Sequence, residues 1–171
     1  FELRRDLDAY LATLSDPAMP DSLAEVVAFN RANADREMRW FGQDLFEQAL
    51  TATDEAAYVA AREANLKATR EDGIDRMLAQ HRVEFLVAPT TGPAWVSDLI
   101  RGDNFPGGIG AGSLAAIAGY PHLTLPMGAV EGLPVGMSFM GGKWQDHAIL
   151  KAGAAYERAR TAPLPTPSFK R

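Results

Sequence analysis

The hydrophobic pattern of this chain changes its period near Val83, and that change limits the folds open to it. Before Val83, apolar residues recur at helical spacing, first at Leu3, Leu7, Tyr10, Leu11 and Leu14. After Val83 they alternate with other residues, as along strands, at Leu123, Leu125 and Met127 and at Val135, Met137 and Phe139. Helices followed by strands predict an α/β fold in which the front-half helices pack around a small sheet. We expect strands near 84–89, 123–127 and 135–140 to share that sheet.

Capping residues mark where the front-half helices begin. Ser22 is followed three residues later by Glu25, a capping box that predicts the start of a helix. Thr53 and Asp54 are placed to cap the longest helix. Gly73 is expected to weaken the last part of that helix, since glycine is a poor helix former.

A long segment rich in glycine and proline follows the first predicted strand. The apolar run from Phe85 to Ala88 has no alternation, which predicts a strand covered on both faces. From Thr90 to Gly112 no clear periodicity is present, and a loop of this length is typical of functional or poorly ordered segments. Ser113 is expected to cap a short buried helix after it. A proline-rich tail from Thr161 is expected to run over the surface.

Composition excludes several classes of function. The 171 residues suit one domain, 1–171, with a sizeable core. A net charge of −5 without a basic tract argues against nucleic-acid binding. The absence of cysteine removes disulfides, thiol catalysis and cysteine metal sites, and it fits a cytoplasmic location. Because no apolar run is long enough to span a bilayer, we expect no association with membranes.

The histidines offer little chemistry by their spacing. His81, His122 and His147 have no metal-ligand spacing among themselves, so we expect no metal site. His122 lies in the stretch AGYPHLTLPMG, beside a predicted strand. Most histidines in such places are hydrogen-bonded parts of the structure, and we interpret His122 in that way.

The residues alone contain no convincing catalytic motif and no cofactor motif. The run GGIGAGS, 107–113, lacks the lysine of a phosphate loop, and its Ser113 stands where a dinucleotide-binding loop has its third glycine. The surroundings of Ser113 also differ from a nucleophile elbow. Asp98 and Asp103 flank the long loop, but nothing marks their environment as apolar enough to shift a pKa. The run is interpreted as a flexible turn that enters a helix, or alternatively as a mobile wall of a substrate pocket.

Three longer stretches resemble the closing third of the amidase signature enzymes. They are LVAPTTGPAW (86–95), SLAAIAGYPHLTLPMG (113–128) and GLPVGMSFMGGKWQDHAILKAGAAYERA (132–159). Their order is also the same: a strand ending in Pro-Thr, a long loop, a small-residue helix ending in Ala-Gly-x-Pro, and a Gly-Leu-Pro-Val-Gly strand. The upstream stretches FGQDLFEQAL and GIDRML are similar to bacterial members, especially the peptide-amidase-like branch.

The resemblance implies a fold as well as a family. It implies the C-terminal part of the amidase-signature α/β/α fold, with a mixed sheet and covering helices. Under this resemblance, Pro126 is expected near the end of its strand, where a lost backbone donor costs least. His122 stands at a variable position of the pattern, so the resemblance gives it no catalytic role.

The resemblance also implies a chemistry that this chain cannot complete. Amidase signature enzymes hydrolyse C–N bonds with a Ser–cis-Ser–Lys triad in their first half, around a Gly-Gly-Ser-Ser run and an upstream lysine. This chain has no Gly-Gly-Ser-Ser, so no catalytic residue is assigned to it. We interpret it as a C-terminal fragment of an amidase that supplies sheet, helices and part of the substrate pocket. Alone, the chain is expected to be inactive.

The long loop provides the candidate substrate-binding residues. It connects two buried elements, and the resemblance places the substrate wall of the family in this segment. The candidates are Thr91, Trp95, Asp103, Gly110 and Ser113. The substrate is expected to be a small amide or a peptide amide.

Two other interpretations remain open. The first is the subunit of a glutamine-dependent amidotransferase that shares this C-terminal pattern. The second is a chain that stands alone, as a non-catalytic binding or assembly module derived from the fold. For an amidase fragment, the expected partner is the missing N-terminal half of the same enzyme. The surface that meets it is expected to be apolar, which would favour homo-oligomers of the isolated chain.

Overall fold

The computed structural model describes residues 1–105, 107–108 and 110–164, and it divides the chain into two compact units. The first unit is Phe1–Ala61 and the second begins at Arg62, so the division falls within one helix. The expectation of a single domain stays a prediction, and most of the proline-rich tail lies outside the described residues.

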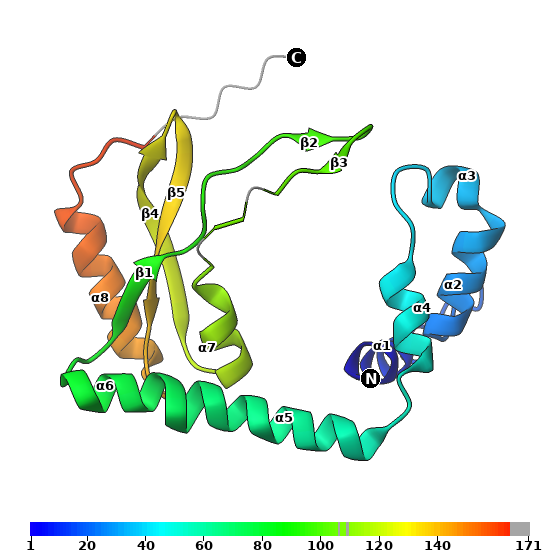
Figure 1. The fold of residues 1–171 in the computed structure, drawn as a ribbon, viewed down its shortest axis with the longest axis horizontal. Helices are drawn as coiled ribbons and strands as arrows, with labels where there is room; N and C mark the ends of the chain where they lie inside the picture. Colours follow the sequence, from blue (N-terminus) through cyan, green and yellow to red (C-terminus); the bar gives the residue numbers. More distant parts are fainter. Residues whose placement is uncertain (106, 109, 165–171) are drawn as a thin grey trace. The chain divides into compact units, whose positions relative to one another are not determined.

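The first unit is helical (Figure 1). Its complete helices are α1 (Glu2–Leu11), α2 (Leu23–Ala32), α3 (Ala34–Glu37) and α4 (Asp44–Thr51). Its buried centre is made by Leu23, Val27 and Ala49, with Leu7, Phe46 and Leu50 packed around them. These residues come from α1, α2 and α4, so each of these helices turns one apolar face to the same core.

The start of α2 is stabilised as the capping box predicts. The Ser22 hydroxyl accepts a hydrogen bond from the backbone N–H of Glu25, at 3.4 Å. The Glu25 carboxylate reaches back to the N–H of Asp21, at 3.0 Å. The N–H of Leu23 donates to the carboxylate of Asp8 in α1, at 2.7 Å. These N–H groups at the start of the helix are therefore satisfied by side chains.

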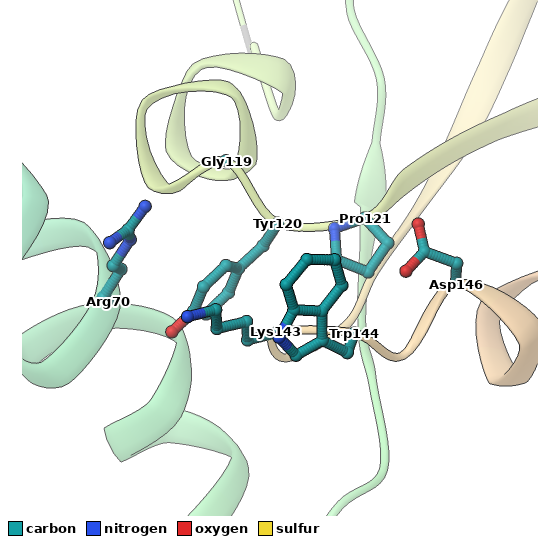
Figure 2. A pocket seen from close by; sticks show the side chains of 7 residues that line it. All are labelled: Arg70, Gly119, Tyr120, Pro121, Lys143, Trp144 and Asp146. Carbon is teal, nitrogen blue, oxygen red and sulfur yellow. The ribbon is translucent and has the colours of Figure 1, made fainter.

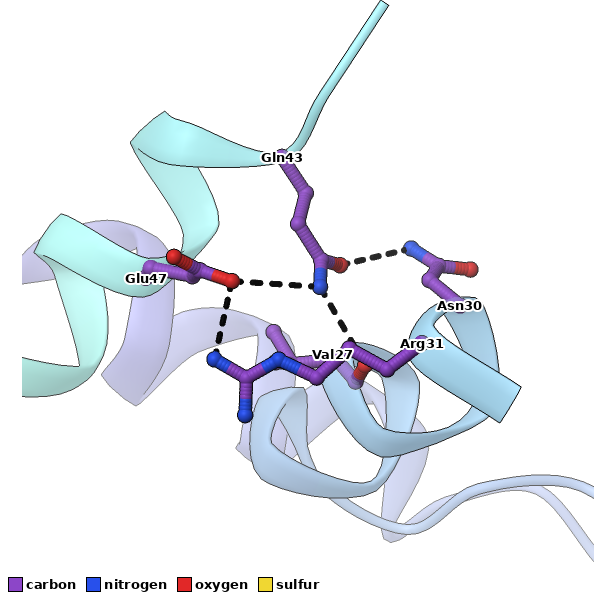
Figure 3. Close-up of polar contacts among 5 residues, drawn as sticks. All are labelled: Val27, Asn30, Arg31, Gln43 and Glu47. Carbon is purple, nitrogen blue, oxygen red and sulfur yellow. Dashed lines mark hydrogen bonds and ion pairs between the residues drawn. The ribbon is translucent and has the colours of Figure 1, made fainter. Parts of the chain in front are cut away.

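A buried glutamine joins α2 to α4, as Figure 3 shows. The Gln43 amide nitrogen donates to the carbonyl of Val27 at 3.3 Å and to Glu47 at 3.4 Å. The amide oxygen of Gln43 accepts from Asn30 at 3.1 Å, and Arg31 pairs with Glu47 at 2.9 Å. Both ends of the buried amide are thus paired, as a buried polar group requires.

The second unit begins within a long helical segment that is kinked. The segment comprises α5 (Glu55–Thr69), the π-helical turn η1 (Arg70–Asp75) and α6 (Arg76–His81). The carboxylate of Asp54 accepts from the N–H of Ala57 at 2.9 Å, which confirms Asp54 as a cap. Gly73 has non-helical dihedral angles, and a Cβ there would lie 2.7 Å from the carbonyl oxygen of Ala68. The predicted weak point at Gly73 is therefore the kink.

The predicted strands form one antiparallel sheet with the order β1-β5-β4, which confirms that they share a sheet. The strands are β1 (Leu86–Pro89), β4 (His122–Val130) and β5 (Leu133–Met140). In the register, Ser138 of β5 lies between Ala88 of β1 and Thr124 of β4. The mixed sheet implied by the resemblance refers to the whole family fold, and the pairings described in this chain are antiparallel.

Helices cover both faces of this sheet (Figure 1). One face carries α8 (Asp146–Ala159), where Gly153 leaves room for the side chains of Leu123 and Leu125. The other face carries α7 (Gly112–Ala118). The core on that side contains Ile74, Ala111, Ala115, Ala118 and Met140. The α/β class is therefore confirmed.

Two local predictions are wrong. Pro126 lies in the middle of β4 rather than near its end. The strand tolerates it because the ladder shifts register between Pro126 and Gly128, and bulges accept residues that cannot donate. Ser113 does not cap α7, because the helix already begins at Gly112 and Ala111 occupies the capping position.

Candidate functional site

The long loop closes on itself at its base. The carbonyl of Thr90 accepts a hydrogen bond from the N–H of Ala111, at 3.0 Å. The next pair inward, Thr91 and Gly110, forms an antiparallel bridge. The structure therefore brings together two predicted site residues that are far apart in the sequence.

The middle of the loop is a small hairpin rather than an irregular segment. It pairs β2 (Ser97–Asp98) with β3 (Gly102–Asp103). The indole N–H of Trp95 donates to the carboxylate of Asp103, and the Trp95 ring lies 4.7 Å from the Phe105 ring. Two more predicted residues, Trp95 and Asp103, are thus in direct contact across the hairpin.

The turn of this hairpin is held by Asp98. Its carboxylate accepts from the backbone N–H groups of Ile100 at 2.9 Å and Arg101 at 3.0 Å. The hydrogen bonds from Arg101 and Ile100 favour the charged form and lower the pKa of Asp98. Asp98 is therefore a turn-forming residue and not a candidate general acid.

The fifth predicted residue, Ser113, lies apart from the other pairs. It is exposed in the first turn of α7, directly after Gly112. The five candidates therefore occupy the base of the loop, its hairpin and the start of α7. Their role in lining a substrate pocket stays a prediction.

A group of polar side chains that the sequence analysis did not identify adjoins the loop base. This polar cluster consists of Thr90, His122, Thr124 and Ser138, from the end of β1 and from β4 and β5. The Ser138 hydroxyl donates to Thr90 Oγ1 at 2.9 Å and lies 2.6 Å from His122 Nε2. The hydroxyls of Thr90 and Thr124 are also hydrogen-bonded to each other.

Strand alternation could have indicated part of this cluster. His122 and Thr124 are two residues apart, so they point to the same face of β4. The predicted hairpin contains Ser138 on the partner strand, where it lies opposite Thr124. The contribution of Thr90 could not be found in this way, because it depends on the distant pairing of β1 with β5.

The contact between His122 and Ser138 has the length of a nucleophile–base pair but not its accessibility. Ser138 is fully buried, at 0% exposure. A nucleophile must reach the carbonyl carbon of its substrate, whereas Ser138 is enclosed by neighbouring strands. Gly136 on the same strand leaves space for the cluster, because a Cβ there would lie 2.7 Å from Thr124 Oγ1. The cluster is therefore suited to holding backbone in place.

A separate hollow of about 370 Å³ lies at the C-terminal end of α7. Figure 2 shows its lining residues, which are Arg70, Gly119, Tyr120, Pro121, Lys143, Trp144 and Asp146. Arg70 Nε donates to the carbonyl of Ala118 at 2.7 Å. Burial, and then the hydrogen bond to Asp75, raise the pKa of Tyr120. None of the predicted site residues lines this hollow, and its lining contains no hydroxyl or thiol nucleophile other than a phenol.

Neither a metal-ion cluster nor a membrane-spanning helix is present in the described part of the chain. Residues 1–105, 107–108 and 110–164 contain no group of three acidic, histidine or cysteine residues arranged to hold a metal ion. Among the helices of these residues, none combines the length and the apolar character that a membrane span requires.

Comparisons with known proteins point to one family. The family model described as Amidase matches residues 2–150. The solved peptide amidase from Stenotrophomonas maltophilia is 40% identical, with a TM-score of 0.85, over 96% of this chain and 33% of that protein. A probable amidase from Arabidopsis thaliana is 28% identical over 160 residues, which are 92% of this chain and 28% of that protein.

A shorter match involves a different enzyme. A glutamyl-tRNA(Gln) amidotransferase subunit from Latilactobacillus sakei subsp. sakei (strain 23K) is 38% identical over 56 residues. These are 33% of this chain and 12% of that protein. The chain thus spans no more than 33% of the length of any of these proteins. Since the family model covers most of the chain, and the likeness to a peptide amidase agrees with the resemblance inferred from the motifs, this chain belongs to the amidase family, in its peptide-amidase-like branch.

Proposed function

We propose that this chain is the C-terminal part of an amidase that hydrolyses the C–N bonds of peptide amides or other small linear amides. The observation that carries the proposal is the likeness to a peptide amidase, which extends over 96% of the chain at 40% identity. In the comparison of sequences, the likeness to a probable amidase extends over 92% of the chain, whereas the likeness to the amidotransferase subunit extends over 33%. A hydrolase of linear amides therefore accounts for more of this sequence than an amidotransferase does.

Within this proposal, the chain supplies structural support and one wall of the substrate pocket. It supplies no catalytic groups. The Ser–cis-Ser–Lys triad that the resemblance implies is proposed to lie in an N-terminal part of the longer protein, which is the proposed partner of this chain. The antiparallel sheet and its covering helices hold the closed base of the loop, and the hairpin carries Trp95 and Asp103. An indole and a carboxylate offer a planar apolar face and an acceptor, which suit a peptide side chain and an amide N–H.

Exposed apolar side chains within the second unit support a contact with the rest of the longer protein. Val87 on β1 and Leu150 on α8 are both large and more than half exposed. Exposed apolar surface is typical of interaction sites. Association of the isolated chain into homo-oligomers through the same surface remains a prediction.

The proposal is tested by assaying the longer protein that contains this chain. We expect it to release ammonia from peptides that carry a C-terminal amide. Glutamine in the presence of misacylated tRNA is the matched substrate for the amidotransferase alternative. Formation of glutamate from glutamine in that second assay, with no ammonia released from peptide amides, would reject the proposal.

Substitutions in the hairpin should change substrate preference in the longer protein. Trp95→Ala and Asp103→Ala each remove one partner of the hydrogen bond between the hairpin arms, so the proposed wall shifts. We expect kcat/KM to fall by about three- to tenfold, as for the loss of one ordinary hydrogen bond with a net contribution of about 0.5–1.5 kcal/mol. The measurement is kcat/KM over a panel of peptide amides that differ in the last residue. Val96→Ala is the control, because Val96 is adjacent but 81% exposed. Unchanged values for both variants across the panel would show that the hairpin does not line the pocket.

A further inference from the structure

We propose that His122 is a positioning residue that holds the closed base of the loop against the sheet and thereby sets the position of the substrate wall. This inference rests on the proposed function, because it assigns the loop a role in binding the amide. It gives a function to a histidine for which the family resemblance provides none.

The first observation is that Thr90 is held through every polar atom it has. Its N–H donates to the carbonyl of Gly136 at 2.8 Å, and its carbonyl accepts from the N–H of Ala111 at 3.0 Å. Its hydroxyl is bonded to both Ser138 and Thr124. Thr90 is the first residue of the loop and Ala111 lies at its end, so the position of Thr90 determines where both ends of the loop leave the sheet.

The second observation concerns Ser138, which connects Thr90 to His122. Ser138 is fully buried, so its hydroxyl cannot exchange a protein partner for water. With Ser138 donating to Thr90, the Nε2–H of His122 is the donor to Ser138 Oγ. His122 therefore orients the Ser138 hydroxyl toward Thr90.

The third observation is that His122 also lies against the other end of the loop. A Cβ built on Gly112, the first residue of α7, would lie 3.7 Å from His122 Cε1, which is ordinary contact distance. The imidazole ring is thus adjacent to the start of α7. It is also hydrogen-bonded to Ser138, which in turn is hydrogen-bonded to Thr90. One side chain on β4 therefore binds the residue that holds Thr90 and lies beside the start of the helix that follows the loop.

The experiment uses the longer protein with His122→Ala, His122→Gln and the control His147→Ala. Glutamine can present an N–H near the place of Nε2, whereas alanine cannot. His147 is an exposed histidine on α8, which covers the opposite face of the sheet. We expect His122→Ala to raise KM for a peptide amide about tenfold with kcat nearly unchanged, as for one lost anchoring hydrogen bond. His122→Gln should restore most of the loss, and His147→Ala should behave like the unchanged protein.

Trypsin cleavage provides a second measurement that does not depend on activity. Arg101 lies in the exposed turn of the hairpin, while Arg82 lies in a separate exposed turn after α6. If His122 holds the loop base, His122→Ala should speed cleavage after Arg101 several-fold while cleavage after Arg82 keeps its rate.

The outcomes are distinguishable from a failure of the proposed function. A longer protein that cleaves no peptide amide would refute the function, and the trypsin measurement would still decide whether His122 holds the loop. Unchanged KM and unchanged cleavage after Arg101 in His122→Ala would refute the inference. Faster cleavage after both arginines, with no rescue by glutamine, would show a general loss of stability and would also refute it.

Discussion

Purified by itself, the chain is expected to release no ammonia from peptide amides above the rate of a heat-killed sample. Hydrolysis by this family needs an activated serine and a base within hydrogen-bond reach of each other. In the described residues the one serine bonded to a histidine is Ser138, which is fully buried. Loss of a whole nucleophilic triad lowers kcat by about 10⁶-fold in a serine hydrolase, and a comparable loss is expected here.

The assay needs variants that would locate any unexpected activity. Ser113→Ala tests the exposed serine after the glycine-rich run, and Ser138→Ala tests the buried one. Turnover that disappears in Ser113→Ala would overturn the interpretation as a fragment and make the loop an active site. Turnover that disappears only in Ser138→Ala would assign catalysis to the contact with His122. Binding of a peptide amide without turnover would agree with a wall of the pocket, and also with a non-catalytic binding module.

Much of the fold could be predicted because it depends on short-range patterns. The box of Ser22 and Glu25 needs only three residues of spacing, and it is present as expected. The strands near 123–127 and 135–140 follow from alternation and a short turn. Pro126 was misplaced because the bulge that accommodates it depends on the register of two strands, which alternation does not determine.

The candidate site was predicted less completely, for a physical reason. The sequence shows that 90–113 is a long loop between buried elements, but it does not show which residues meet across it. The contacts of Thr91 with Gly110 and of Trp95 with Asp103 appear only when the chain folds back. The anchor at Thr90 depends on contacts with residues 34 and 48 positions away. Such contacts are set by the topology of the sheet, which local periodicity cannot specify.

Replacing Ile74 by alanine should cause a large loss of stability in the second unit. Ile74 is 0% exposed, in a core whose other buried members are mainly alanines. Small neighbours cannot extend into the space that a lost side chain leaves, so most of the cavity should remain open. We expect the free energy of unfolding to fall by about 3–4 kcal/mol, within the range for opening a buried cavity of this kind.

The chain offers a matched chemical control for this substitution at Ile100, which is 95% exposed in the turn of the loop hairpin. Ile100→Ala removes the same atoms without opening a cavity, so it should change the free energy of unfolding by less than about 0.5 kcal/mol. Urea unfolding of both variants, followed by circular dichroism, measures the two changes against the unchanged chain. The difference between them separates the cavity from the change in side-chain chemistry. Equal losses for Ile74→Ala and Ile100→Ala would contradict the position of Ile74 in the core, and with it the packing of η1 against α7 that supports the loop base.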